Sequence, residues 1–169
     1  MSDGVDEPAW GRASERLVAV LTAQDFDQSY YAWCRESADT DADELPAGAP
    51  AVREFIEAFR AAGATVDRDG RTRRFTVTVD AGPTVVELQC ELGRGINTLS
   101  PQLPVSVGGA ARERAVSLSG LARKVLFARQ HDAHDPLYPY PIVRTRRQLD
   151  ALTREIVRML QAVARDYPA

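Results

Sequence analysis

The chain has 169 residues, a length that fits one folded domain and allows a hydrophobic core without metals or disulfides. Hydrophobic residues make up 44% and charged residues 27% of the chain, as in ordinary globular proteins, which excludes disordered, collagen-like and fibrous classes. No apolar run approaches the roughly 18 residues of a membrane-spanning helix, so a helix that crosses the bilayer is excluded.

Charge is distributed unevenly along the chain, whose net charge is −3. Residues 1–50 carry 11 acidic and 3 basic residues, whereas residues 51–169 carry 13 acidic and 18 basic residues. Two parts of opposite sign favour either pairing within the molecule or a partner of mixed charge. The isoelectric point of about 5.4 is lower than that of typical nucleic-acid binders, so nucleic acid is not the partner we expect.

The chain opens with acidic and polar residues and contains two cysteines. We expect residues 1–7 to form a disordered tail in front of a single domain over residues 8–169. This opening has neither the basic flank nor the apolar core of a secretory signal. Cys34 and Cys90 are therefore expected to be free thiols rather than a disulfide, and the protein is expected in the cytoplasm.

Three helices are predicted in the first third of the chain. Apolar residues at helical spacing indicate a helix over residues 9–23, and Asp25 is a candidate cap for a second, short helix. Residues 37–49 are acidic and then rich in Pro, Gly and Ala, which predicts a mobile loop. The third helix begins at Pro50, carries the i, i+3, i+4, i+7 pattern of apolar residues and ends at Gly63.

The apolar period then changes from about 3.6 to 2, which is typical of strands. The segments predicted as strands are 64–68, 75–79, 86–92, 96–99 and 105–107. Residues 80–83, Asp-Ala-Gly-Pro, separate the second segment from the third and predict an antiparallel hairpin. Pro101 and Pro104 favour an edge position for the strands near them. The alternation leaves five polar side chains facing outward: Thr76, Thr78, Glu87, Gln89 and Glu91.

Two helices complete the predicted fold. Ser117 or Ser119 is a candidate cap for a helix that runs to about Gln130, and Thr145 is a candidate cap for a last helix over residues 146–165. Because the strands are grouped together between helices, we predict the α+β class. The expected architecture is an antiparallel β-meander of three to five strands packed against N- and C-terminal helices in a two-layer single domain.

The segment His131-Asp132-Ala133-His134-Asp135 is the densest collection of metal-ligating side chains in the sequence. The four candidate ligands, His131, Asp132, His134 and Asp135, could hold a divalent metal such as zinc, and an open position on that metal could activate water. A proline follows directly and ends the helix, and no distant motif completes a metal site. The alternative interpretation is a solvated loop that closes the preceding helix.

Two arginine clusters repeat the sequence Arg-Thr-Arg-Arg. Their candidate anion-binding residues are Arg71, Arg73, Arg74, Arg144, Arg146 and Arg147. If the fold brought the clusters together, they could bind phosphate or nucleic acid. The alternative interpretation is a solvated hairpin end and a solvated helix start, because neither cluster contains the aromatic residues that single-strand binding uses.

An acidic segment and a pair of tyrosines are the candidates for contact with a partner protein. The acidic candidates are Asp25, Asp27, Glu36, Asp39, Asp41, Asp43 and Glu44. Complementary charge at such a segment would favour a partner with a basic surface. Tyr138 and Tyr140 alternate with prolines in a stiff segment that suits an interface, with packing on the protein's own core as the alternative.

The sequence contains no motif that assembles reaction machinery or holds a cofactor, and both cysteines lie on apolar faces. It therefore favours a non-catalytic protein–protein interaction, as in immunity or antitoxin proteins and secretion chaperones of bacteria. The expected partner is another protein, or a second copy of the chain in a homodimer, and no cofactor is expected. A metal-dependent enzyme or ligand-binding domain at the His-Asp segment is the alternative, and nucleic-acid binding through the arginine clusters is a further one.

Overall fold

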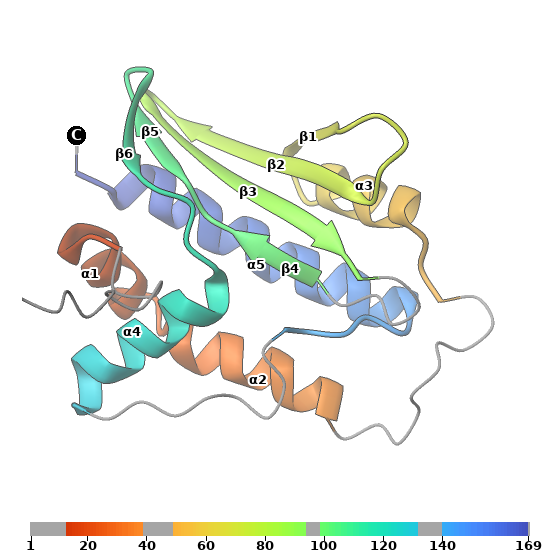
Figure 1. The fold of residues 1–169 in the computed structure, drawn as a ribbon, viewed down its shortest axis with the longest axis horizontal. Helices are drawn as coiled ribbons and strands as arrows, with labels where there is room; N and C mark the ends of the chain where they lie inside the picture. The colour runs from red at the N-terminus through yellow and green to blue at the C-terminus, as the bar shows by residue number, and fades with distance from the viewer. Residues whose placement is uncertain (1–12, 39–48, 94–98, 132–139, 169) are drawn as a thin grey trace, which may run out of the picture.

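The computed structural model describes residues 13–38, 49–93, 99–131 and 140–168. Within these ranges the chain forms five helices and one six-stranded antiparallel sheet, which confirms the predicted α+β class (Figure 1). The helices are α1 (Glu15–Ala23), α2 (Phe26–Ala38), α3 (Val52–Ala61), α4 (Leu118–Gln130) and α5 (Arg146–Asp166). The strands are β1 (Thr65–Arg68), β2 (Arg74–Ala81), β3 (Thr84–Leu92), β4 (Leu99–Gln102), β5 (Val105–Val107) and β6 (Ala110–Glu113).

The sheet has the strand order β1-β2-β3-β5-β6, and β4 pairs with the remaining part of β3. The first residues of β3 pair with β5 and its last residues pair with β4, so both strands lie along one edge of β3. Between them the carbonyl of Pro104 accepts a hydrogen bond from the N–H of Glu87 at 3.2 Å. The pair β4 and β5 therefore behaves as one strand interrupted at a proline. The predicted edge position fits β4 but is wrong for β5, because β6 pairs with β5 on its other side.

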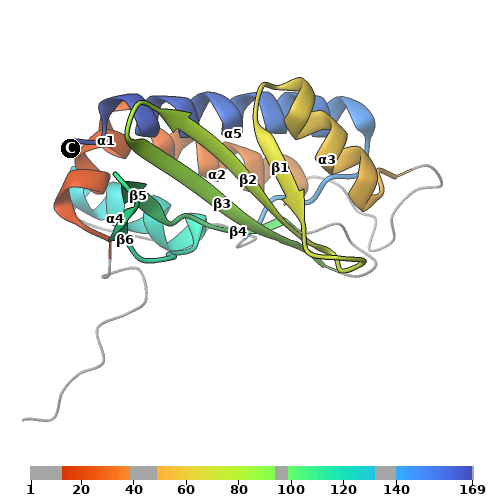
Figure 2. The same cartoon turned by 90° about the horizontal axis from the view of Figure 1, so that it is seen from above.

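Alternation of side chains gives the sheet one buried and one polar face. In β2 and β3 the buried positions are Phe75, Val77, Val79, Thr84, Val86, Leu88, Cys90 and Leu92. Helix α5 packs on this face across β2 and β3, and α3 lies beside it next to β1 (Figure 2). The five polar side chains predicted to face outward occupy exposed or half-buried positions on the opposite face.

Helices α1, α2 and α4 form a second group beside the β4 side of the sheet (Figure 1). Their buried side chains join those of the sheet, α3 and α5 in one hydrophobic core. The largest fully buried side chains come from the sheet and from every helix except α5: Leu17, Leu21, Phe26, Tyr30, Phe55, Phe59, Phe75, Leu88, Leu92, Leu99, Leu103 and Leu118. No helix among the described residues has the length and apolar character needed to cross a membrane.

The helix boundaries confirm two predicted caps and add one that was not predicted. Ser117 caps α4 and Thr145 caps α5. The side chain of Gln148 accepts a hydrogen bond from the backbone N–H of Thr145, which completes a capping box. The first helix starts at Glu15 with Ser14 as its cap, and residues 9–12 of the prediction lie outside the described part. Asp25 has a left-handed backbone (φ 52°) at the junction between α1 and α2.

One predicted loop and one unpredicted strand differ from the sequence pattern. The loop expected over residues 37–49 begins later, because α2 continues to Ala38, and residues 39–48 of that prediction lie outside the described part. The strand β6 was not predicted, because its residues Ala110–Glu113 are mostly exposed and carry no apolar alternation. The predicted tail over residues 1–7 also lies outside the described ranges.

A buried carboxylate fastens the two ends of the described chain together. Glu113 at the end of β6 is 4% exposed. It accepts hydrogen bonds from the backbone N–H of Ser14 at 3.1 Å, from the Ser14 hydroxyl and from the Tyr167 hydroxyl at 2.7 Å. Since Ser14 caps α1 and Tyr167 follows α5, this one side chain connects β6 to both helices.

Candidate functional site

The predicted metal segment is described at one residue only. His131 is the C-cap of α4 in a left-handed conformation (φ 56°), and its exposed ring packs edge-on against Phe127 with ring centroids 6.4 Å apart. Asp132, His134 and Asp135 lie outside the described residues. Among the described residues, no three His, Cys, Asp or Glu side chains are grouped closely enough to hold a metal ion. The metal hypothesis therefore stays a prediction.

The predicted acidic contact segment is engaged within the molecule at its beginning. Arg129 on α4 pairs with Asp25 at 2.9 Å and with Asp27 at 3.1 Å. Asp27 is 2% exposed, so its carboxylate is not available to a partner, and this argues against the predicted contact there. Glu36 is exposed on α2. The remaining candidates lie outside the described residues: Asp39, Asp41, Asp43 and Glu44.

The tyrosine pair is also described only in part, since Tyr138 lies outside the described residues. Tyr140 is half-buried, and the proline after it, Pro141, is buried. The carbonyl of Pro141 accepts a hydrogen bond from the N–H of Leu99 in β4 at 3.0 Å. The segment leading into α5 is thus fastened to the edge of the sheet, which favours a connector that packs on its own core.

The two arginine clusters lie in different layers. Arg71, Arg73 and Arg74 belong to the turn between β1 and β2 and the start of β2, whereas the second cluster surrounds the start of α5. Arg73 donates to the carbonyls of Leu92 and Gly93, both at 2.8 Å. Ion pairs join Arg74 to Glu91, and Arg146 to both Glu54 and Asp150. Arg71 and Arg147 are exposed, and Arg144 is half-buried.

Both cysteine thiols are buried and free. Burial raises the pKa of the Cys34 thiol to about 12 and raises the pKa of the Cys90 thiol further. Both sulfurs are therefore protonated at neutral pH, and a protonated, enclosed thiol is a poor nucleophile.

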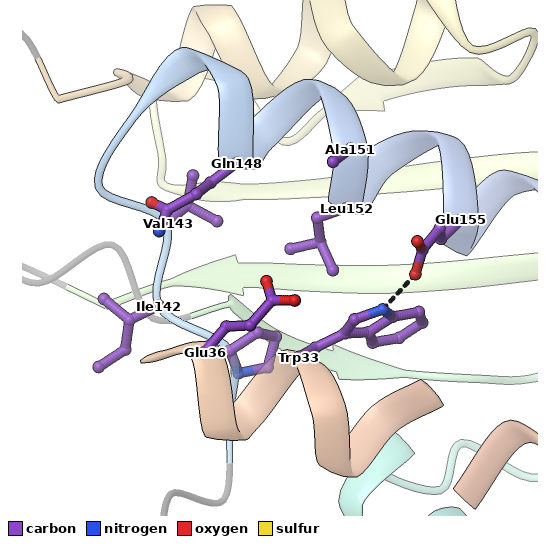
Figure 3. Close-up of a pocket in the computed structure, with 9 residues that line it drawn as sticks. Trp33, Glu36, Ile142, Val143, Gln148, Ala151, Leu152 and Glu155 are labelled. Atoms are coloured by element: carbon purple, nitrogen blue, oxygen red, sulfur yellow. Dashed lines mark hydrogen bonds between the residues drawn. The ribbon is translucent and has the colours of Figure 1, made fainter. Parts of the chain in front are cut away.

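A groove between α2 and α5 is the candidate functional site. The two helices run in opposite directions (Figure 1), and Trp33 and Glu155 line both halves of the groove. The indole Nε1 of Trp33 donates to Oε2 of Glu155 at 2.5 Å (Figure 3). This hydrogen bond connects the helices and separates a narrow half of the groove from a wide half.

The narrow half has a volume of about 80 Å³ and an acidic rim. Its lining residues are Trp33, Glu36, Pro141, Ile142, Val143, Gln148, Ala151, Leu152 and Glu155. Figure 3 shows the carboxylate of Glu36 directed from α2 toward α5, next to the apolar side chain of Leu152. The carboxylates of Glu36 and Glu155 make this half attractive to a cation.

The wide half has a volume of about 460 Å³ and a basic rim. Its lining residues are Gln24, Phe26, Ser29, Trp33, Glu155, Arg158, Met159, Ala162 and Arg165. Phe26 and Met159 are buried below the groove, whereas Arg158 and Arg165 are exposed at its rim. The side-chain nitrogen of Gln24 is buried and has no hydrogen-bond partner among the described residues.

An aromatic cluster on α2 supports the centre of the groove. The ring centroids of Phe26, Tyr30 and Trp33 lie 5.8 to 6.4 Å from one another in tilted and edge-on arrangements. Such contacts hold an indole in one orientation. The surface that Trp33 presents to the groove is therefore formed before anything binds, which lowers the entropic cost of binding.

A second concave surface lies on the polar face of the sheet, with a volume of about 410 Å³. Its lining residues are Asp69, Arg74, Phe75, Thr76, Gln89, Cys90, Glu91 and Gln102. Arg74 and Glu91 at this site pair with each other at 3.1 Å and are both exposed. This surface is polar and already paired, so the α2–α5 groove is the better candidate for binding an apolar side chain.

Sequence reasoning did not find the groove, because Trp33 and Glu155 are 122 residues apart. The exposed arginines of α5, in contrast, recur at a helical spacing that is visible in the sequence. The groove itself is the guide to function, because no family model, no curated protein and no solved structure matches the chain.

Proposed function

We propose that the protein is a non-catalytic binding module for another protein, in the manner of immunity proteins or secretion chaperones. A segment of the partner lies in the groove between α2 and α5. One observation carries this proposal: the buried apolar side chains of Phe26, Trp33 and Met159 form a preformed floor in the wide half, which has a basic rim and adjoins the acidic narrow half. Apolar anchors surrounded by charge are typical of sites that bind protein segments.

The chemistry of the described residues supports binding more than catalysis. The two thiols are buried and protonated, and Glu155 is bound to the indole of Trp33 instead of standing free for proton transfer. Two free thiols also suit the cytoplasm, which we keep as the expected compartment.

The proposed contact differs from the one that the sequence favoured. The sequence pointed to the acidic segment starting at Asp25, with a basic partner. Arg129 pairs with Asp25 and with the buried Asp27, and of the described part of that segment Glu36 is the residue that lines the narrow half of the groove.

A displayed library of random peptides tests the proposal. Peptides are selected on the immobilised wild-type protein and then measured against two variants. Ala162→Trp fills the wide half of the groove, where Ala162 is half-buried. Ala128→Trp is the matched control, because Ala128 is an exposed alanine on α4 that lines neither half of the groove.

We expect selected peptides to bind the wild type and the control equally and to bind Ala162→Trp at least about tenfold more weakly, since a filled pocket excludes an anchor side chain. Circular dichroism and urea denaturation confirm that both variants fold. The proposal is refuted if selection enriches no peptide, or if the enriched peptides bind Ala162→Trp as well as they bind the wild type.

A further inference from the structure

Four arginines of α5 form a line on the exposed side of the helix. They are Arg147, Arg154, Arg158 and Arg165, and all four are exposed; we name them the arginine ridge. At about 100° per residue, Arg147 and Arg165 point in the same direction, and the other two deviate from it by about 20°. The ridge is about 27 Å long, at about 1.5 Å per residue.

The ridge lies opposite the buried side of the same helix. Ile156 is half a turn away from the ridge, and it is fully buried together with Leu149 and Leu160. Because that buried side packs on β2 and β3, the ridge points away from the sheet (Figure 2). No described element of the fold is packed on α5 from this direction.

Two of the acidic residues next to the ridge are bound to side chains outside it. Asp150, four residues before Arg154, pairs with Arg146 at 2.9 Å. Glu155, three residues before Arg158, accepts the hydrogen bond from Trp33. Arg165 pairs with its neighbour Asp166 in an exposed contact, which contributes little. Arg147, Arg154 and Arg158 form no ion pair with another described residue, so positive charge accumulates here on a chain of net charge −3.

The ridge and the groove are parts of one surface, because Arg158 and Arg165 line the wide half of the groove. An apolar side chain that enters this half over Phe26 and Met159 brings the neighbouring side chains of its own segment beside two guanidinium groups. Guanidinium groups bind carboxylates in planar, two-point contacts. Carboxylates on the incoming segment would therefore meet Arg158, which has no ion pair with a described residue, and Arg165, which is held only by the exposed carboxylate of Asp166.

We propose that the partner segment is an acidic amphipathic helix. Its apolar side enters the wide half of the groove, and its Asp and Glu side chains follow the arginine ridge. A second helix alongside α5 has the same rise per residue, so carboxylates spaced seven, four and seven residues apart meet the four arginines in turn. This inference rests on the proposed function and specifies the chemistry of its partner.

Nucleic acid is the competing polyanion, and the surface fits it less well. The net charge of −3 works against association with nucleic acid. The apolar groove beside the ridge would also remain unfilled under a phosphate backbone, whereas an amphipathic helix uses both surfaces.

The peptides selected on the wild type test this inference separately from the proposed function. We expect Asp and Glu to be enriched in these peptides. We also expect the affinity of the peptides to fall when sodium chloride is raised from 50 to 500 mM, because the Debye length shortens from more than about 10 Å to less than about 8 Å. Peptides that depend on the groove but are neutral or basic would leave the proposed function standing and overturn the inference. An absence of any selected peptide would overturn both.

Charge reversal identifies the ridge as the source of the preference. Arg154→Glu with Arg158→Glu should weaken an acidic peptide at least about tenfold and should strengthen a version of that peptide in which Lys replaces each acidic residue. Arg53→Glu with Arg71→Glu is the matched control, because both are exposed arginines, on α3 and in the turn between β1 and β2, and line neither half of the groove. Unchanged affinity in the ridge variant would overturn the inference, as would tighter ridge-dependent binding of a 20-base-pair DNA duplex than of the acidic peptide.

Discussion

Replacing Glu113 should destabilise the whole domain, because three donors lose their shared acceptor. The donors are the N–H and hydroxyl of Ser14 and the hydroxyl of Tyr167. Hydrogen bonds to a charged group contribute about 1.5–3 kcal/mol each, but removing the carboxylate also relieves its own cost of burial. For Glu113→Ala we therefore expect a loss of about 3 kcal/mol in the free energy of unfolding, measured by urea denaturation. For a domain of this size, that loss lowers Tm by roughly 6–12 °C.

Two further variants separate the contributions to this cluster. Tyr167→Phe removes one donor and keeps the ring, so we expect a loss of about 1.5 kcal/mol. In the Glu113→Ala background the same substitution should cost about 1 kcal/mol less, because its acceptor is already gone. If Glu113→Ala unfolds within about 0.5 kcal/mol of the wild type, or if the two substitutions are additive, Glu113 does not fasten these elements.

Three other predictions follow from the described contacts. Burial raises the pKa of Cys34 from 9.0 to about 12 in the folded protein, so the protonated thiol contributes its full stabilisation below pH 9, and this contribution is lost as the pH rises toward 12. Between these pH values the free energy of unfolding should fall less steeply in Cys34→Ala than in the wild type, by about 1.4 kcal/mol per pH unit, as measured by urea denaturation. Thr145→Ala removes the cap of α5 and should cost about 1 kcal/mol in the same assay. Thr65→Ala is the control, because Thr65 is exposed and its side chain forms no hydrogen bond with a described residue, and it should cost less. Arg129→Met leaves the buried carboxylate of Asp27 unpaired and should cost about 2 kcal/mol, whereas Asp25→Asn, at the exposed end of the same pair, should change stability by less than about 0.5 kcal/mol; equal effects would contradict the assigned burial.

Much of the architecture could be predicted because it depends on local patterns. The helix after Pro50 ends where Gly63 adopts a left-handed backbone (φ 100°), and the hairpin turns at Gly82 (φ 60°), so both boundaries follow from residues that tolerate such geometry. Thr145 and Ser117 mark the starts of α5 and α4 in a similarly local way, because their side chains accept hydrogen bonds from N–H groups in the first turn of each helix.

The candidate site could not be predicted in the same way, because it depends on contacts between distant segments. The sequence offered Asp25 and Asp27 as surface charges, and nothing in their neighbourhood indicates that Arg129, more than a hundred residues later, pairs with both. The groove likewise requires that α2 and α5 lie side by side in opposite directions, which depends on the packing of the whole core. The alignment of the four arginines along one side of α5, by contrast, can be predicted from the helical period alone.

The meeting of Ser14 and Tyr167 at Glu113 places the first and last described elements of the domain at one corner of the molecule. A short peptide could join these positions into a closed ring, and the chain could then be reopened at the exposed Gly82–Pro83 turn without crossing the core. The same geometry suits insertion of this domain into a loop of a host protein, because the two connections to the host would lie next to each other. The arginine ridge would then still face the solvent.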